Sequence, residues 1–317
     1  MKKTKLILTI LLCITAISFI ACSSPSNSGS DNSGNTGTAG TGTGGSGGGN
    51  ENSTVTYIGT KAPAEAKAVG DIVFNDGSAM AYTDWVALEN GDDKTTKKNA
   101  AIALIFYKGT GLNSDVNNVA DTTTSRTLGV GLKHNKNGLA LCTSSANARN
   151  KNITTIQCSA SGDAGSLTFT GDKNGSNNLE QIAAFLSAEG SETTDDTTGE
   201  GASDRYPAFY FGKNYATSMV TNIAANSEFA TGWYLPSIAE LFQIYACRAD
   251  TTNGFDIDAA SEALGGDKFE DLMCRSSSQN AFSDRPWCGI YFYDGDWDDG
   301  GDIDASNSVC CSIRAFN

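Results

Sequence analysis

Histidine and proline are both scarce in this sequence. Its 317 residues contain one histidine, His134, and five prolines. A single histidine excludes any zinc site that needs two of them, and it leaves little room for a Ser-His-Asp triad. His134 lies within the polar segment 131–136. We therefore expect it in a surface turn and not in a catalytic site.

Positive charge is also in short supply. The chain has 22 Lys and Arg against 36 Asp and Glu, which gives a formal net charge of −14. An acidic protein repels phosphate groups, so nucleic acid is a poor candidate partner.

The length of the chain, 317 residues, allows one or two domains.

Long apolar runs are confined to the N-terminus. Three lysines at positions 2, 3 and 5 precede a mostly apolar run over 6–20, which predicts a signal peptide over residues 1–21. The run is too short to remain as a membrane-spanning helix. Ala21 before Cys22 resembles the lipobox of bacterial lipoproteins. This resemblance implies cleavage before Cys22, acylation of its sulfur and a lipid anchor in the cell envelope, exposed at the outer-membrane surface; the alternative is a plain secretory signal.

Residues 22–54 lack the side chains from which a core could be built. After Cys22 the segment is rich in Gly and Ser and has no aromatic or branched aliphatic residue. Nothing in it can be buried to offset the loss of chain entropy, so we expect a disordered tether. The folded domain is then expected over residues 55–317.

Short apolar stretches and turn residues predict a mixture of strands and helices in this domain. Apolar residues at helical spacing favour a helix over 179–188, and a second short helix is expected over 257–265. Residues 190–204 are polar and predict a surface loop. Strands are expected over 69–74, 100–107, 128–132, 138–142, 207–211 and 308–316.

The strongest local motif is GWYLPSIAEL at 232–241. Ser237 can cap a helix that begins after it, and Glu240 three residues later completes a capping box. Apolar side chains at 238, 241, 242 and 245 would then share one helical face. The motif predicts a strand that leads into a helix packed on a sheet.

This motif resembles an element of the formylglycine-generating-enzyme type of C-type lectin fold. The segments VGDIVFNDG at 69–77, SSSQNA at 276–281 and SVCCSIRAF at 308–316 add to the resemblance. It implies an α+β domain over about 65–317, with two helices packed on short antiparallel sheets. Insertions are expected at about 109–127 and 190–204.

The C-terminal segment 276–317 further resembles the variable region of proteins diversified by retroelements, in particular the Treponema type of surface lipoprotein. In such systems the reverse transcriptase misreads adenines of the template. Asn codons are thereby changed to codons for Asp, Gly, Tyr, Ser, Cys and Ile. Residues 284–306 consist almost entirely of this set. Changes at the adenines of Asn codons seldom produce codons for Trp or Phe, so we expect scaffold residues at Trp287, Phe292 and Trp297. In the terminal strand, the expected core residues are Val309, Ile313 and Phe316.

The resemblance implies a binding protein, without enzymatic activity, cofactor or metal, that recognises a protein or glycan on another cell or on a host. Its membrane partner would be the lipid bilayer, through Cys22. The variable positions should form one exposed patch. They are Asp284, Arg285, Cys288, Gly289, Ile290, Tyr291, Tyr293, Asp294, Asp296, Asp298, Asp299, Gly300, Gly301, Asp302, Ile303, Asp304 and Ser306.

Other interpretations of this acidic segment stay open. Asp294, Asp296 and Asp298 have the spacing of a calcium loop, although its sixth position is Asp299 and its twelfth is Ala305. A solvated acidic loop is a simpler alternative. A calcium-dependent lectin could use Trp287 and Trp297 to stack on a sugar. A formylglycine-generating oxidase is disfavoured because the C-terminal half has no Cys-x4-Cys pair.

Seven cysteines remain in the expected domain. Setting aside Cys288 as a variable position leaves six, which allow fifteen pairings. Cys310 and Cys311 are neighbours and would point to opposite faces of a strand. Either disulfides or buried free thiols fit the sequence. The seven are Cys142, Cys158, Cys247, Cys274, Cys288, Cys310 and Cys311.

Overall fold

The computed structural model describes residues 56–112, 121–190, 197–248, 255–269, 273–281, 287–298 and 308–317. All of them belong to one compact unit, Thr54–Asn317. No helix within these ranges is both long and apolar enough to cross a membrane. The lipobox at Cys22 and the tether lie outside the described residues.

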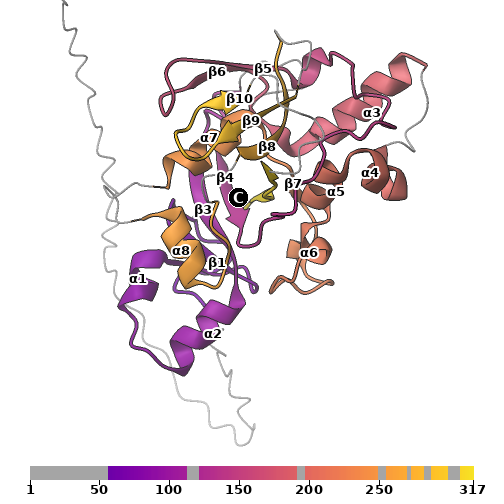
Figure 1. The fold of residues 1–317 in the computed structure, drawn as a ribbon. Helices are drawn as coiled ribbons and strands as arrows, with labels where there is room; N and C mark the ends of the chain where they lie inside the picture. The colour runs from indigo at the N-terminus through magenta and orange to yellow at the C-terminus, as the bar shows by residue number, and fades with distance from the viewer. Residues whose placement is uncertain are drawn as a thin grey trace, which may run out of the picture. The chain divides into compact units, whose positions relative to one another are not determined.

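A six-stranded antiparallel sheet forms the centre of this unit (Figure 1). Its longest strand, β3, runs through the apolar segment that the sequence predicts to be a buried strand. Residue pairing is antiparallel throughout the sheet. In spatial order the strands are β2 (Ala79–Ala81), β1 (Asp71–Phe74), β3 (Ala101–Gly109), β4 (Arg126–Gly131), β12 (Ile313–Ala315) and β7 (Trp233–Tyr234).

Both faces of the central sheet are covered, which explains why its strands are nearly continuously apolar. Ile72 and Leu104 face one cluster of buried side chains, whereas Val73 and Ile105 face another. This division follows from the two-residue alternation of a strand. The expected core residues Val309, Ile313 and Phe316 are all buried, as predicted.

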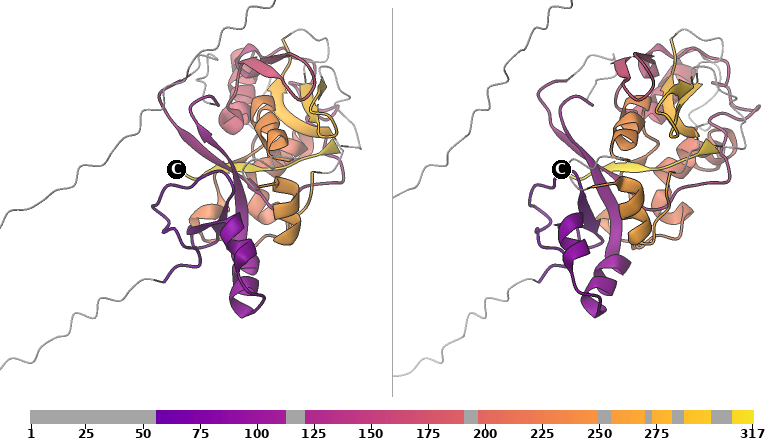
Figure 2. Two further views of the ribbon diagram at one scale, coloured as in Figure 1. Left: turned by 90° about the vertical axis from the view of Figure 1, so that its left-hand side faces the viewer. Right: turned by 60° about the vertical axis from the view of Figure 1, so that its left-hand side comes forward.

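The motif at 232–241 folds as predicted. Strand β7 leads into helix α7 (Ile238–Ala246), and Ser237 and Glu240 form the capping box. Helix α7 contacts β3 on one side and strands β8 and β9 on the other. Figure 2 shows this orange helix between the purple strands of the central sheet and the yellow strands of a second sheet.

That second sheet carries the C-terminal segment. Its order is β10 (Trp297–Asp298), β9 (Trp287–Tyr291), β8 (Met273–Gln279) and β11 (Ser308–Val309). The β11–β8 pair is parallel and the others are antiparallel. A third sheet pairs β5 (Cys158–Ser161) with β6 (Thr168–Gly171). The fold class is therefore α+β with mostly antiparallel sheets.

Helices are more numerous than expected. The described residues hold eight α-helices, whereas the resemblance implies two. The helices expected over 179–188, after Ser237 and over 257–265 are all present, as α3 (Asn178–Ala188), α7 and α8 (Ile257–Ala263). The others are α1 (Tyr82–Ala87), α2 (Asp92–Ala100), α4 (Gly199–Arg205), α5 (Pro207–Lys213) and α6 (Tyr215–Ser218).

Three local expectations are wrong. The predicted strand at 207–211 is helix α5, because Pro207 takes the first helical position, where its missing N–H costs nothing. Residues 138–142 form no strand. The predicted surface loop 190–204 contains most of α4.

The expectation that His134 lies in a surface turn is also wrong. Its side chain is 3% exposed, and its ring lies 4.1 Å from the ring of Phe269 between centroids. The polar neighbours in the sequence suggested a surface turn, but Phe269 covers the imidazole from another part of the chain.

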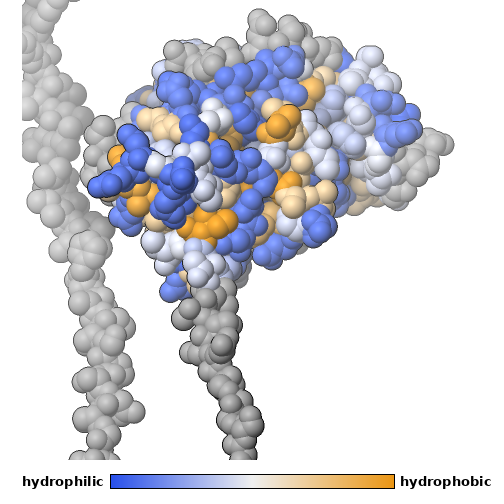
Figure 3. Space-filling view, turned by 90° about the horizontal axis from the view of Figure 1, so that it is seen from below, coloured by the Kyte–Doolittle hydropathy of each residue, from blue (hydrophilic) through white to orange (hydrophobic). Residues whose placement is uncertain are grey.

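Hydrophilic side chains cover most of the face seen in Figure 3, from below Figure 1. Among the coloured residues on this face, hydrophobic side chains form small separate patches. Such scattered exposure is ordinary for a folded domain, so this face gives no sign of a large apolar interface.

Candidate ligand-binding site

The described part of the predicted variable segment, residues 287–298, forms a hairpin of β9 and β10. Its turn is closed by Gly295 N–H donating to Tyr291 O at 2.8 Å and by Tyr291 N–H donating to Asp296 O at 2.8 Å. Asp294 Oδ1 accepts a further bond from Asp296 N at 3.0 Å. Gly295 has φ of 74°, a conformation that glycine adopts without strain. The hairpin tip is thus a fixed turn.

The hairpin is anchored in both cores. Trp287 is fully buried on one side and packs edge-on against Phe209, with 5.9 Å between ring centroids. Phe292 is buried on the other side and stacks on Phe269 at 4.7 Å. The prediction that Trp287 and Phe292 are scaffold is confirmed. Trp297 is half-buried and packs against the same core as Phe292.

The tip of the hairpin presents aromatic and acidic side chains together. Tyr293 is 58% exposed, and its ring lies 5.4 Å from that of Tyr291. Asp296 is exposed, while Asp294 and Asp298 are half-buried. Burial, and next the charge of Asp298, raise the pKa of Tyr291 above its ordinary value.

Three of the expected variable positions are not on this surface. Cys288 and Ile290 are 1% and 0% exposed and lie in the core beside Phe292. Gly289 is buried as well, and a Cβ there would stand 2.6 Å from Cys274 O. The expectation that these three contact a ligand is wrong, because strand pairing turns them inward or leaves no room for a side chain.

The remaining expected positions divide between the described hairpin, where they are exposed or half-buried, and the undescribed chain. Tyr291, Tyr293, Asp294, Asp296 and Asp298 are the described members of the predicted patch, and all lie on the β9–β10 hairpin. Nine others lie outside the described residues: Asp284, Arg285, Asp299, Gly300, Gly301, Asp302, Ile303, Asp304 and Ser306.

A pocket of about 630 Å³ adjoins the hairpin tip. Phe292 and Tyr293 form one wall, and Tyr245 at the end of α7 forms another. Arg248, Asp256 and Asp258 supply its charged groups. An open pocket that combines tyrosine rings with convergent charged groups can hold a polar ligand and also pack against it. We call it the hairpin pocket.

Internal bonds hold the charged groups of this pocket in place. Arg248 Nε donates to Asp258 Oδ2 at 2.7 Å, and the guanidinium also donates to Phe292 O. The Asp256 carboxylate caps α8 by accepting from Asp258 N at 2.9 Å and Ala259 N at 3.1 Å. These groups are therefore oriented before any ligand arrives.

Sequence reasoning missed the pocket residues outside the variable segment. Tyr245 was expected on the apolar face of α7, and it is half-buried between that face and the hairpin. Asp256 precedes a predicted helix and could have been recognised as its N-cap. Nothing in the sequence places either residue beside Tyr293.

A second pocket of about 630 Å³ lies along β7, away from the hairpin. Two of its basic side chains, Lys213 and Arg314, already have partners within the protein. Lys213 Nζ lies 2.6 Å from Glu180 Oε1, and Arg314 donates to the carbonyl oxygens of Thr231 and Glu228. This pocket contains none of the predicted variable positions.

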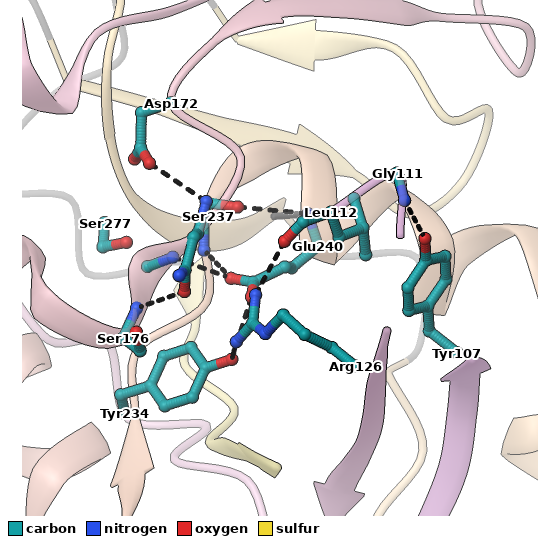
Figure 4. A network of polar contacts seen from close by, with 12 residues as sticks. Tyr107, Gly111, Leu112, Arg126, Asp172, Ser176, Tyr234, Ser237, Glu240 and Ser277 are labelled. Carbon is teal, nitrogen blue, oxygen red and sulfur yellow. Dashed lines mark hydrogen bonds and ion pairs between the residues drawn. The ribbon is translucent and has the colours of Figure 1, made fainter. Parts of the chain in front are cut away.

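Glu240 is the centre of a buried polar network (Figure 4). Its carboxylate accepts from Arg126 Nη1 at 2.9 Å, the Tyr234 hydroxyl at 2.8 Å, Ser237 N at 2.8 Å and Gly175 N at 3.1 Å. Burial, followed by the carboxylate charge, raises the pKa of Tyr234 well above its usual value. A carboxylate with four donors serves as a structural anchor, in line with its predicted capping role.

Metal ligands do not gather within the described part of the chain. No three His, Cys, Asp or Glu side chains there could hold an ion together. In the hairpin, Asp294 and Asp296 each accept a backbone N–H instead. Asp299 and Ala305, which complete the calcium-loop spacing, lie outside the described residues.

Comparison with known proteins gives little. No family model and no curated protein matches this chain. Among solved structures, a fimbrial protein from Bacteroides ovatus is similar at 13% identity with a TM-score of 0.47. The match covers 78% of this chain and 49% of the fimbrial protein, so the chain spans about half the length of that protein.

Proposed function

We propose that this protein is a ligand-binding lipoprotein of the cell envelope, displayed at the outer surface. Its C-terminal segment would be diversified by a retroelement to recognise varied protein or glycan targets. The domain would have the C-type lectin fold of the formylglycine-generating-enzyme type. The lipid on Cys22 and the Gly/Ser tether would hold it at the membrane and extend it outward.

One observation carries the proposal. Within a single hairpin, Trp287 and Phe292, which Asn codons yield poorly, are buried and Trp297 is half-buried, whereas Tyr293 and Asp296 at the tip are exposed. A binding surface that varies needs a base that does not vary with it, because core substitutions cost far more stability than exposed ones. Trp287 and Phe292 supply such a base.

The three buried positions narrow the proposed variable set. Changes at Cys288, Gly289 or Ile290 would disturb strand pairing or the core. The described part of the ligand surface is therefore the tip of the hairpin with the adjoining hairpin pocket. Tyr293 belongs to both.

The proposal is tested by the DNA around the gene. We expect a near-copy of codons 276–317 that differs at adenines, beside a reverse-transcriptase gene. Copies of the gene from different isolates should differ at codons 293, 294, 296 and 298 and agree at 287 and 292. Substitutions spread evenly over buried and exposed codons would contradict the proposal.

Anchoring has its own test. Cells that express the full chain are fed labelled palmitate, and the Cys22→Ser variant is the matched control. Label in the native protein alone supports the anchor. Equal label in both would exclude lipidation at this sulfur.

A further inference from the structure

Two buried cysteines flank the C-terminal segment and meet in the core. Cys274 lies in β8, and Cys311 follows β11, the strand that pairs with β8 in parallel. Their Sγ atoms are 3.9 Å apart. The two side chains are 1% and 0% exposed and belong to the same apolar cluster.

We propose that Cys274 and Cys311 are a disulfide-forming pair that closes residues 275–310 into a covalent loop. A disulfide needs the two sulfur atoms at about 2.05 Å, so they must approach by about 2 Å. Val309 pairs with Cys274 across the strands, and Cys311, two residues further along, belongs to the same buried cluster as both. Rotation of the two cysteine side chains would have to supply the approach.

The adjacent Cys310 is excluded as the partner by its direction. It contributes to the opposite apolar cluster, together with Trp287 and Phe316. This agrees with the alternation of side chains in extended backbone. The proposal therefore distinguishes between two cysteines that are neighbours in the sequence.

The bond would join the two ends of the segment that carries the hairpin. Everything between β8 and β11 would be held at its base by a covalent link, whatever residues occupy the tip. The geometric argument is independent of ligand binding. Only the oxidising surroundings that favour the bond rest on the proposed export from the cytoplasm.

The chemistry is a two-step thiol–disulfide exchange. The thiolate of one cysteine attacks a disulfide oxidant such as oxidised glutathione, forms a mixed disulfide and releases one glutathione thiolate. The second cysteine then attacks the protein sulfur and displaces the other glutathione. The protein loses two electrons and two protons overall, and two molecules of reduced glutathione are formed.

Burial determines when this exchange can occur. Both thiols are inaccessible in the folded domain, and burial raises the pKa of Cys311 well above its usual value, which suppresses its thiolate. We expect the bond to form while the chain folds, before β11 closes on β8. Reduced protein that is already folded should oxidise much more slowly.

Peptide mapping tests the link directly. The full chain is refolded with oxidised glutathione, unfolded in the presence of N-ethylmaleimide and digested with trypsin. Cleavage after Arg275 separates Cys274 from the later cysteines, and Pro286 blocks cleavage after Arg285. We expect peptide 269–275 to be joined to peptide 276–314, with the joined mass lost on reduction.

Matched variants identify the partner within the longer peptide. The joined mass should persist in Cys310→Ala and Cys288→Ala and disappear in Cys311→Ala. A wild-type chain in which Cys274 is alkylated after oxidative refolding would overturn the proposal, even if every variant misfolds. Persistence of the link in Cys311→Ala would overturn it as well.

Thermal melting tests the consequence of the loop. Closing a loop of this length restricts the unfolded chain, so the oxidised wild type should melt roughly 5–10 °C above the reduced form. The difference should vanish in Cys311→Ala and remain in Cys310→Ala. Equal melting of both wild-type forms would show that the link does not hold the segment.

Discussion

Gly295 at the tip of the hairpin lies directly against the ring of Tyr245 in α7. A Cβ at position 295 would stand 2.3 Å from Cε1 of Tyr245, closer than carbon atoms approach in proteins. Gly295 also has φ of 74°. The predicted capped helix thus fixes the turn that presents Tyr293 and Asp294.

Substitution of Gly295 by alanine should destabilise the domain by about 2–4 kcal/mol. Positive φ costs a residue with a Cβ roughly 1–2 kcal/mol, and the contact with Tyr245 adds a cost of overpacking. The free energy of unfolding is measured by urea denaturation. The double variant Gly295→Ala with Tyr245→Ala should lose less than the sum of its single changes.

Gly190 offers a matched control for the backbone contribution. It also has positive φ, 65°, but a Cβ there would meet no described residue within 4 Å. Gly190→Ala should cost only the roughly 1–2 kcal/mol of the backbone strain. Equal costs at positions 190 and 295 would mean that Tyr245 does not constrain the hairpin turn.

Substitutions at exposed positions of the hairpin should cost much less stability than substitutions at its buried positions. Tyr293→Ala should cost less than about 1 kcal/mol, because the side chain is mostly in solvent. Ile290→Ala should cost about 2–5 kcal/mol, because it leaves a cavity beside Phe292. Thermal melting of both variants measures the difference. Similar losses would contradict the division into a fixed base and a variable tip.

Signals that are local in the sequence predicted the structure best. Ser237 and Glu240 satisfy each other within one turn, so their capping box could be recognised from four adjacent residues. Side chains alternate between the two faces of a strand, which places Trp287 and Cys288 on opposite faces, and this signal is equally local. Such features depend little on distant parts of the chain.

Expectations that depended on distant contacts were wrong or incomplete. His134 lies in a polar stretch and becomes buried only because Phe269 covers it. Gly289 belongs to the residue types that the codon argument selects, yet Cys274 O leaves no space for a side chain there. The hairpin pocket likewise combines residues from α7, α8 and β9–β10, whose proximity no sequence pattern states.

The buried His134 should make the domain sensitive to mild acid. Burial lowers its pKa from 6.5 to about 4, against the opposing charges of Asp267 and Asp258, while Lys136 lowers it further. Its Nδ1 has no hydrogen-bond partner among the described residues. Below about pH 6.5 the unfolded chain therefore binds a proton that the folded chain rejects until about pH 4.

The free energy of unfolding should then fall as the pH is lowered through this window. From pH 7 to pH 5 the expected loss is about 2 kcal/mol. Because the chain has one histidine, no other side chain has its ordinary pKa between these values. His134→Gln should flatten the dependence in urea denaturation at both pH values. An unchanged slope would show that His134 is accessible to protons in the folded state.

The pair of Arg126 and Glu240 should contribute far more to stability than a surface pair of similar length. Arg126 is 8% exposed and Glu240 0%, whereas Lys213 and Glu180 are 56% and 55% exposed. Arg126→Ala would leave the Glu240 carboxylate buried without its counter-ion, which costs about 3–5 kcal/mol. Lys213→Ala should cost less than about 1 kcal/mol, because water screens that pair. Urea denaturation of both variants gives the comparison. Equal and small effects would mean that Tyr234, Ser237 and Gly175 suffice to hold Glu240, and that α7 does not need Arg126 to anchor the hairpin.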